Sequence, residues 1–376
     1  MELERVIDRE LELLTPDLER LRRGRARQEA VWKGTEADSL PLLLGNVAVD
    51  EREEFPTFNK KEQFYDKKKM LSDKLWRLIA VARGGSDAQL SMPADLGAGF
   101  VPSVLGLRQR VFEDKDPWLK ECLPKDRIAA IEPDEIGDVT ELGLMPRAVE
   151  YSRYFRQKLG SRAQVCLCGD MFWGPFSLAH LIRRDDLFTD LVDDPPFVHH
   201  LMELATTLYV RTVTTVKEAA GEPRATGYRN ELYLGDGGVM VNEDTMILVS
   251  AAHAEEFAYP YLRRALGAFE GGLVHFCGDG RHLLDSLVRI PELRGVNFGD
   301  PRHYDYDAVI RQLVAAGKFY YGGWPRGEGD TAEHHFRRLL APLEGAKRGL
   351  IAAYHVDRKT ERPGEVLEQW RSVQEE

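Results

Sequence analysis

A histidine and a cysteine stand two residues apart near the middle of the chain, at His275 and Cys277. The surrounding segment, residues 271–280, begins with apolar residues and ends with glycines, which is typical of a β-strand that runs into a tight turn. Because side chains alternate along a strand, both residues are expected on one face. Imidazole and thiolate are ligands that zinc prefers, so the pair predicts half of a zinc site. The alternative is a core strand with a hydrogen-bonded histidine and a small buried cysteine.

The rest of the chain alternates short apolar runs with longer amphipathic segments, such as the helix that Pro195-Pro196 begins and Gly221 ends. This pattern over residues 39–376 predicts an α/β fold, a (β/α)8 TIM barrel, with residues 1–38 as an N-terminal helical extension. The expected strands are residues 41–44, 89–92, 163–168, 231–234, 273–276, 295–298, 318–321 and 350–354.

Polar side chains follow most of these strands, and in a (β/α)8 barrel the functional residues gather at the C-terminal ends of the strands. The carboxylates of Asp170 and Asp236 are candidates to orient a ligand or to receive a proton. The remaining candidates, expected to line a substrate or cofactor pocket, are Asn46, Asp95, Asn297 and Trp324. For Trp324, packing is the alternative role.

The last expected strand ends at His355. The C-terminal end of this strand should lie at the same face of the barrel as His275 and Cys277. Three ligands, His275, Cys277 and His355, would leave a fourth position on zinc for a substrate, as catalytic zinc sites do. Cys168 is a rival third ligand, and a position for His355 at the surface or behind the ligands is the other alternative.

The composition excludes several classes of function. A net charge of −11 over 376 residues argues against a nucleic-acid-binding protein, which needs a basic surface. Apolar runs stay below the roughly 18 residues that span a bilayer, and the first residues lack the pattern of a signal peptide. Four cysteines fit a reducing cytoplasm better than a disulfide framework. The basic cluster at residues 20–25 is interpreted as a solvated helix face or, alternatively, as an anchor for an acidic partner.

Three segments together resemble the uroporphyrinogen decarboxylase superfamily. They are His275-Phe276-Cys277-Gly278, the stretch from Asp244 to Ser250 with Phe257 and Pro260-Tyr261, and Gly174-Pro175-Phe176-Ser177-Leu178-Ala179. The similarity covers the chain from about residue 30 to its end, and it implies the same barrel fold.

Within that superfamily, His-x-Cys at the fifth strand is similar to the zinc motif of the corrinoid-dependent methyltransferases, including the coenzyme M methyltransferases. The resemblance implies that His275 and Cys277 bind zinc and that a methyl group passes from a methylated corrinoid protein to a thiol or a tetrahydrofolate-type acceptor. The third zinc ligand of those enzymes is a cysteine near the end of the last strand. This chain departs from the pattern there, because His355 stands at about that place. The resemblance also implies a homodimer.

Two other functions remain open. The decarboxylases of the superfamily hold substrate carboxylates with an Arg-Gln-Ala-Gly-Arg segment, whereas this chain offers only Arg27-Gln28-Glu29-Ala30. A cofactor-free decarboxylase of a tetrapyrrole or another polycarboxylate would need several cationic side chains at the barrel mouth. A catalytically silent barrel that only binds a ligand is the third hypothesis, and it predicts that His275 and Cys277 lie far from any third donor.

Overall fold

A six-stranded parallel sheet lies at the centre of the protein, as seen in a computed structural model that describes residues 2–376 except 167–171 and 236. The strands are short and almost fully buried, because each carries a run of apolar residues that helices cover on the outside. In spatial order they are β1 (Leu42–Gly45), β12 (Leu350–His355), β11 (Phe319–Gly322), β10 (Leu293–Phe298), β9 (Gly272–Phe276) and β8 (Val239–Asn242).

Among the described residues, two further strands form a separate parallel pair and four others form two antiparallel hairpins. The hairpin β6–β7 contacts β2, β5 and β8, so it lies where the two parallel sets approach each other. The bounds are β2 (Ser91–Pro93) with β5 (Gln164–Cys166), β3 (Gln109–Arg110) with β4 (Trp118–Leu119), and β6 (Gly227–Arg229) with β7 (Leu232–Leu234).

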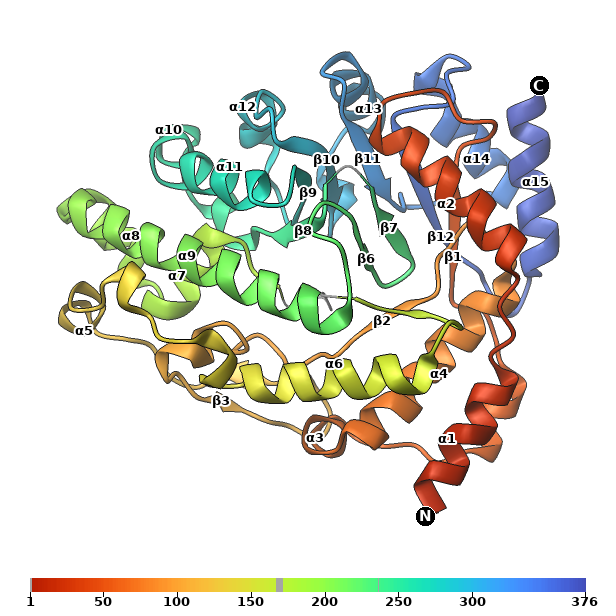
Figure 1. Ribbon diagram of the computed structural model, residues 1–376. Helices are drawn as coiled ribbons and strands as arrows, with labels where there is room; N and C mark the ends of the chain where they lie inside the picture. Colours follow the sequence, from red (N-terminus) through yellow and green to blue (C-terminus); the bar gives the residue numbers. More distant parts are fainter. Residues whose placement is uncertain (1, 167–171, 236) are drawn as a thin grey trace.

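Helices surround the strands (Figure 1). The longest, α9, begins at Pro195, where Asp194 accepts a hydrogen bond from the Phe197 amide, and ends at Gly221 with a φ of 78°, as its sequence predicts. The bounds are α1 (Glu2–Leu13), α2 (Leu18–Trp32), α3 (Lys60–Tyr65), α4 (Lys67–Gly84), α5 (Lys125–Ala129), α6 (Met145–Leu159), α7 (Pro175–Arg183), α8 (Asp186–Asp193), α9 (Pro195–Ala220), α10 (Ala251–His253), α11 (Tyr259–Gly267), α12 (Leu284–Leu287), α13 (Tyr306–Ala315), α14 (Ala332–Leu340) and α15 (Pro363–Glu375).

Seven of the eight expected strands overlap strands of the parallel sets, and the eighth is corrected. Residues 231–234 belong to the antiparallel hairpin β6–β7, whereas the strand beside β9 is β8. The glycines that separate β7 from β8 divide one apolar stretch into two strands, and only the sheet shows which of them pairs with β9. The fold is therefore mixed α/β with the strand–helix order of a TIM-like protein. Within the described residues, no ladder joins β1 to β2 or β5 to β8.

The helices of residues 1–38 pack closely on the rest of the chain. On α1, the buried Glu10 accepts hydrogen bonds from Ser72 Oγ at 2.7 Å and from Trp76 Nε1 at 2.9 Å, which ties it to α4. On α2, Trp32 Nε1 donates to the Tyr233 carbonyl at 2.8 Å, and the Tyr233 amide donates to Gln28 at 2.7 Å. These two bonds connect α2 to the hairpin β6–β7.

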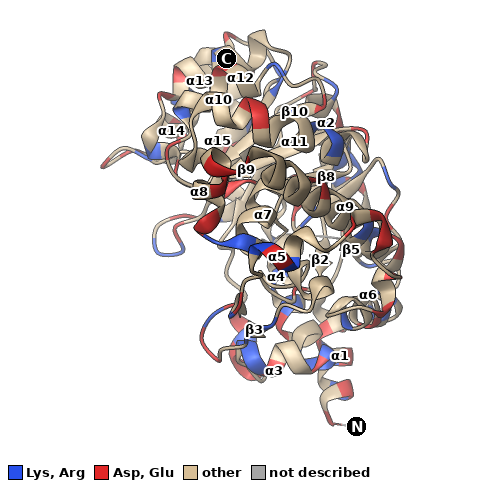
Figure 2. Ribbon diagram, turned by 90° about the vertical axis from the view of Figure 1, so that its left-hand side faces the viewer, with Lys and Arg blue, Asp and Glu red and all other residues tan. Residues whose placement is uncertain are grey.

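Figure 2 shows acidic and basic residues interspersed along the elements in view. Among the residues that the structure describes, no helix is both long enough and apolar enough to cross a membrane.

Candidate metal centre

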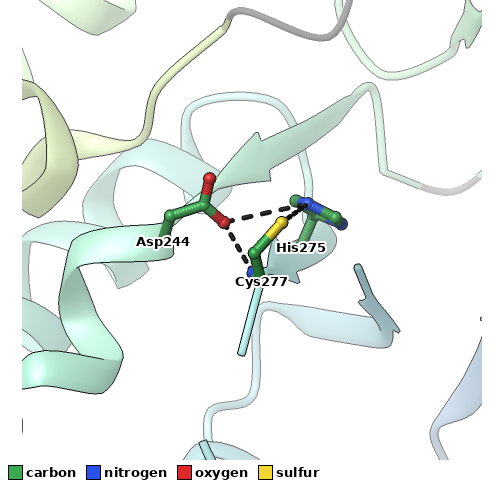
Figure 3. Close-up of side chains that lie close together, drawn as sticks. All are labelled: Asp244, His275 and Cys277. Carbon is green, nitrogen blue, oxygen red and sulfur yellow. Dashed lines mark hydrogen bonds and ion pairs between the residues drawn. The ribbon is translucent and has the colours of Figure 1, made fainter. Parts of the chain in front are cut away.

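Three potential metal ligands gather where β8 and β9 end. Asp244, His275 and Cys277 each offer one donor atom, and these atoms all lie within 4.8 Å of one another (Figure 3). His275 Nε2 is 3.5 Å from Cys277 Sγ and 3.8 Å from Asp244 Oδ1. An imidazole, a thiol and a carboxylate at such distances form a donor set that suits zinc.

The register of the sheet explains this arrangement. His275 pairs with Asn242 on β8 and with Asn297 on β10, so all three occupy the same level of the sheet. Asp244 comes two residues after Asn242 and begins a short 3-10 helix, Asp244–Leu248. Its Oδ1 accepts a hydrogen bond from the Cys277 amide at 2.7 Å, which holds the turn after β9 against the turn after β8.

The orientation of the His275 ring is set by Asn297. Asn297 Nδ2 donates to the Tyr321 carbonyl at 2.6 Å, so its Oδ1 must face the imidazole and accept from Nδ1–H, at 2.5 Å. The proton is thereby assigned to Nδ1, and the lone pair of His275 is left on Nε2. Nε2 is the nitrogen that faces Cys277 and Asp244, as a metal ligand requires.

The charge around Cys277 favours a bound cation. Partial burial, followed by the negative charge of Asp244, raises the pKa of the Cys277 thiol to about 11. Arg229 opposes this effect only weakly. The site therefore concentrates a carboxylate and a thiol with little positive charge to balance them, which is the electrostatic condition that a divalent cation relieves.

A buried glutamate anchors the segment that carries Asp244. Glu243 accepts hydrogen bonds from the amides of Phe176 at 3.2 Å and Ser177 at 2.8 Å, at the start of α7. Gly174 packs against this carboxylate so closely that a Cβ would overlap it. The Gly-Pro-Phe-Ser segment at 174–177 thus positions the loop after β8 by receiving its glutamate.

The hairpin β6–β7 adds a cation to the neighbourhood of the site. Arg229 is 8% exposed, and its Nη1 donates to Asn242 Oδ1 at 3.0 Å, directly beside the His275 level of the sheet. The sequence analysis assigns no role to Asp244 or Arg229. Asp244 could have been predicted as a site residue, because it follows an apolar run and lies in a segment that resembles the family. Arg229 lies in no motif that indicates a function.

His355 is not brought into this cluster. It ends β12, is exposed, and its ring lies against Gly45, where an added Cβ would be 2.9 Å from Nδ1. Because β10 and β11 separate β12 from β9, the carboxylate of Asp244, from the adjacent strand end, takes the place expected of His355 as third donor. Cys168, Asp170 and Asp236 lie outside the described residues.

The other expected pocket residues have local partners. Asn46 Nδ2 donates to the Val356 carbonyl at 2.8 Å, and Asp95 Oδ1 accepts from the Gly97 amide at 3.1 Å. Trp324 packs edge-on against Tyr306, with ring centroids 4.7 Å apart. Asn297 is the one of the four that touches a member of the metal cluster.

Comparison with known proteins finds similarity in the fold. Neither a family model nor a curated protein sequence matches the chain. Among solved structures, a methyltransferase from Methanosarcina mazei superposes with a TM-score of 0.61 at 13% sequence identity. The match covers 94% of this chain and 98% of that one, so the two proteins share their architecture over nearly their full lengths.

Proposed function

We propose that the protein is a zinc-dependent methyltransferase. The observation that carries the proposal is the cluster of Asp244, His275 and Cys277 at adjacent strand ends, with Asn297 turning Nε2 of the histidine toward the other two donors. The fold shared with a methyltransferase supports the same conclusion. In this assignment His275, Cys277 and Asp244 hold the metal.

Zinc would supply a Lewis-acidic centre that lowers the pKa of an incoming thiol, so that the acceptor is nucleophilic at neutral pH. The chain contributes the ligands and their orientation. Asn297 keeps the proton of His275 on Nδ1, and Glu243 holds the loop that carries Asp244. Arg229, fixed to Asn242, places one positive charge near the site.

The His-x-Cys resemblance supports a methylated corrinoid protein as methyl donor and a thiol or tetrahydrofolate-type molecule as acceptor. A reducing compartment such as the cytoplasm suits these roles, because Cys122, Cys166 and Cys277 are all free thiols. The other two hypotheses are less favoured. Decarboxylation of a polycarboxylate needs several cations, whereas the described neighbours of His275 are mainly neutral or acidic. A silent barrel needs no third donor, yet Asp244 lies in range.

The metal is tested first. We expect about one zinc per chain in protein produced with ample zinc, and loss of most of it in His275→Ala, Cys277→Ser and Asp244→Ala, since each removes one ligand. His334→Ala, which changes an exposed histidine on α14, is the matched control and should keep its zinc. Zinc content by mass spectrometry decides the matter, and equal zinc in all variants would refute the ligand set.

The reaction is tested with methylcobalamin as the donor and a panel of thiols and tetrahydrofolate as acceptors. We expect loss of the methyl–cobalt absorbance with at least one acceptor, and at least about a hundredfold lower rate in Cys277→Ser. Zinc binding without any demethylation would leave the metal centre standing but overturn the methyl-transfer proposal.

A further inference from the structure

A cavity lies away from the metal cluster, beside the beginnings of strands β1 and β2. It has a volume of about 300 Å³, and its walls come from α2, α15 and the segment before β2. Figure 1 shows α2 and α15 side by side. Asp87, in this wall, bonds through its backbone amide and its carboxylate to Leu42, the first residue of β1. The metal cluster, in contrast, lies where β8 and β9 end.

Four arginines line this cavity. Arg20, Arg23 and Arg27 recur at three- and four-residue steps on α2, so they share one helix face, and Arg371 comes from α15. Asp87 is the one carboxylate in the lining, which leaves a formal excess of three positive charges. In a chain with a net charge of −11, such a concentration of guanidinium groups is unusual.

The innermost arginine lacks a full set of partners. Arg20 is only 5% exposed, and its Nη1 donates to the carbonyls of Ser86 and Ala88. Its Nε and Nη2 are buried and have no hydrogen-bond partner among the described residues. The carboxylates of Asp17 and Asp87 act on the Arg20 guanidinium only through space. Buried N–H groups without a hydrogen-bond partner are costly, so Nε and Nη2 are donors that the described residues leave unsatisfied.

The neighbouring carboxylates offset the excess of positive charge only in part. Arg27 lies 3.0 Å from Asp87 and 2.9 Å from Asp38, so the four arginines face two carboxylates and two positive charges remain. Asp87 is further occupied by the Leu42 amide at 3.1 Å. Arg23 and Arg371 are exposed and form no ion pair within the part of the chain that the structure describes, so their donors are available to a ligand.

We propose that this cavity binds a small anion with two or more negative charges, a phosphate ester or a di- or tricarboxylate. Guanidinium groups recognise both classes through paired N–H···O bonds. A volume of about 300 Å³ fits a metabolite of that size. The bound anion would supply the hydrogen-bond acceptors that Nε and Nη2 of Arg20 lack, and it would link α2 to α15. This site is independent of the metal centre and of the proposed methyl transfer.

The experiment uses the full chain and three probes, inorganic phosphate, glycerol 3-phosphate and tricarballylate, titrated calorimetrically at constant ionic strength. We expect saturable binding of at least one probe at one site per chain, with a rise in melting temperature. Arg23→Gln and Arg371→Gln should each weaken that binding about tenfold, because each removes a charge-assisted hydrogen bond. Arg22→Gln, which changes an exposed neighbour on α2 outside the cavity lining, should change it less than twofold.

Tighter binding of the phosphates than of tricarballylate would identify the ligand as a phosphate ester, and the reverse order would identify a polycarboxylate. Arg20→Met should abolish binding, and its far-ultraviolet circular dichroism shows whether the chain still folds. If Arg20→Met does not fold, the binding affinities of Arg23→Gln and Arg371→Gln still test the proposal. Absence of saturable binding for all three probes would overturn the proposal, as would equal affinities in Arg23→Gln, Arg371→Gln and the parent chain.

Discussion

In the proposed metal site, the ring of His275 is oriented by a residue that is not itself one of the proposed ligands. Asn297 is held by the Tyr321 carbonyl and in turn holds Nδ1 of His275, so one hydrogen-bond chain passes from β11 through β10 to β9. Residues that orient a metal-binding histidine commonly affect affinity almost as much as the ligands do. We therefore expect Asn297 to act as a positioning residue for His275, a role additional to the predicted pocket role.

Replacing Asn297 tests this role without removing a ligand. We expect Asn297→Leu to weaken zinc binding by about 10- to 100-fold, since the imidazole loses the acceptor that fixes its tautomer. Asn297→Asp keeps an acceptor for Nδ1–H and should remain closer to the parent. Competition with a chromogenic chelator gives the affinities. An unchanged zinc affinity in Asn297→Leu would show that the ring is oriented by other contacts.

Among the elements, the hairpin β6–β7 and the start of β8 depend on one buried ion pair. Lys217, near the end of α9, is 2% exposed and lies 3.5 Å from Glu222, whose side chain is 4% exposed. Its Nζ also donates to the carbonyls of Thr226 and Gly238, each at 3.0 Å. Glu222 accepts from the Tyr228 amide at 2.7 Å. The pair thus joins α9, the hairpin that carries Arg229, and β8.

Lys217→Met removes the lysine partner of the buried Glu222 carboxylate and removes the donor from two carbonyls. We expect the free energy of unfolding to fall by about 3–5 kcal/mol, the usual effect of breaking a buried ion pair. Urea denaturation followed by circular dichroism measures the change. Lys61→Met, at an exposed position on α3, is the control and should differ from the parent by less than about 0.5 kcal/mol. A comparable small effect of Lys217→Met would contradict the role given to the pair.

The stability of the whole molecule should depend on pH through His335. This side chain of α14 is 1% exposed, and burial, followed by the positive charge of Arg338, lowers the pKa of the imidazole to about 4. The unfolded chain takes up a proton near its ordinary pKa of 6.5, whereas the folded chain does not. The contribution of His335 to stability is therefore complete above pH 6.5 and declines as the pH falls toward 4.

We expect the parent chain to lose about 2 kcal/mol between pH 7 and pH 5 through this one group. His335→Gln should remove that part of the pH dependence, whatever its effect at pH 7. Urea denaturation of both proteins at the two pH values, with a chelator present to exclude changes in metal binding, gives the comparison. Identical pH slopes for the two proteins would mean that His335 takes up a proton in the folded state as well.

The two ends of the strand layer differ in chemistry. The ends of β8 and β9 carry imidazole, thiol and carboxylate groups, while the side where β1 and β2 begin carries guanidinium groups on α2 and α15. Arg27 and Gln28, which bear a partial likeness to a substrate-binding segment, lie on that second side. There, Arg27 pairs with Asp38 and Asp87, and Gln28 bonds the hairpin. Their position therefore does not support a role at the metal centre.

The amino-acid sequence by itself determined the alternation of strands and helices and the placement of His275 and Cys277 on one strand end. Both follow from local periodicity: apolar runs of strand length, helix caps at Pro195 and Gly221, and the two-residue repeat of a strand. These features depend on neighbours in the chain, so they can be read without coordinates.

Only the tertiary structure decided the third donor, the role of Asn297 and the presence of Arg229 beside the site. Each depends on strand order and register: β8 beside β9 brings Asp244 to His275, while β10 and β11 separate His355 from it. The sequence alone likewise did not show that the apolar stretch around Gly237 and Gly238 divides into two strands, β7 in the hairpin and β8 in the central sheet. Pairing between distant segments is set by packing of the whole chain, because several pairings satisfy the same local pattern.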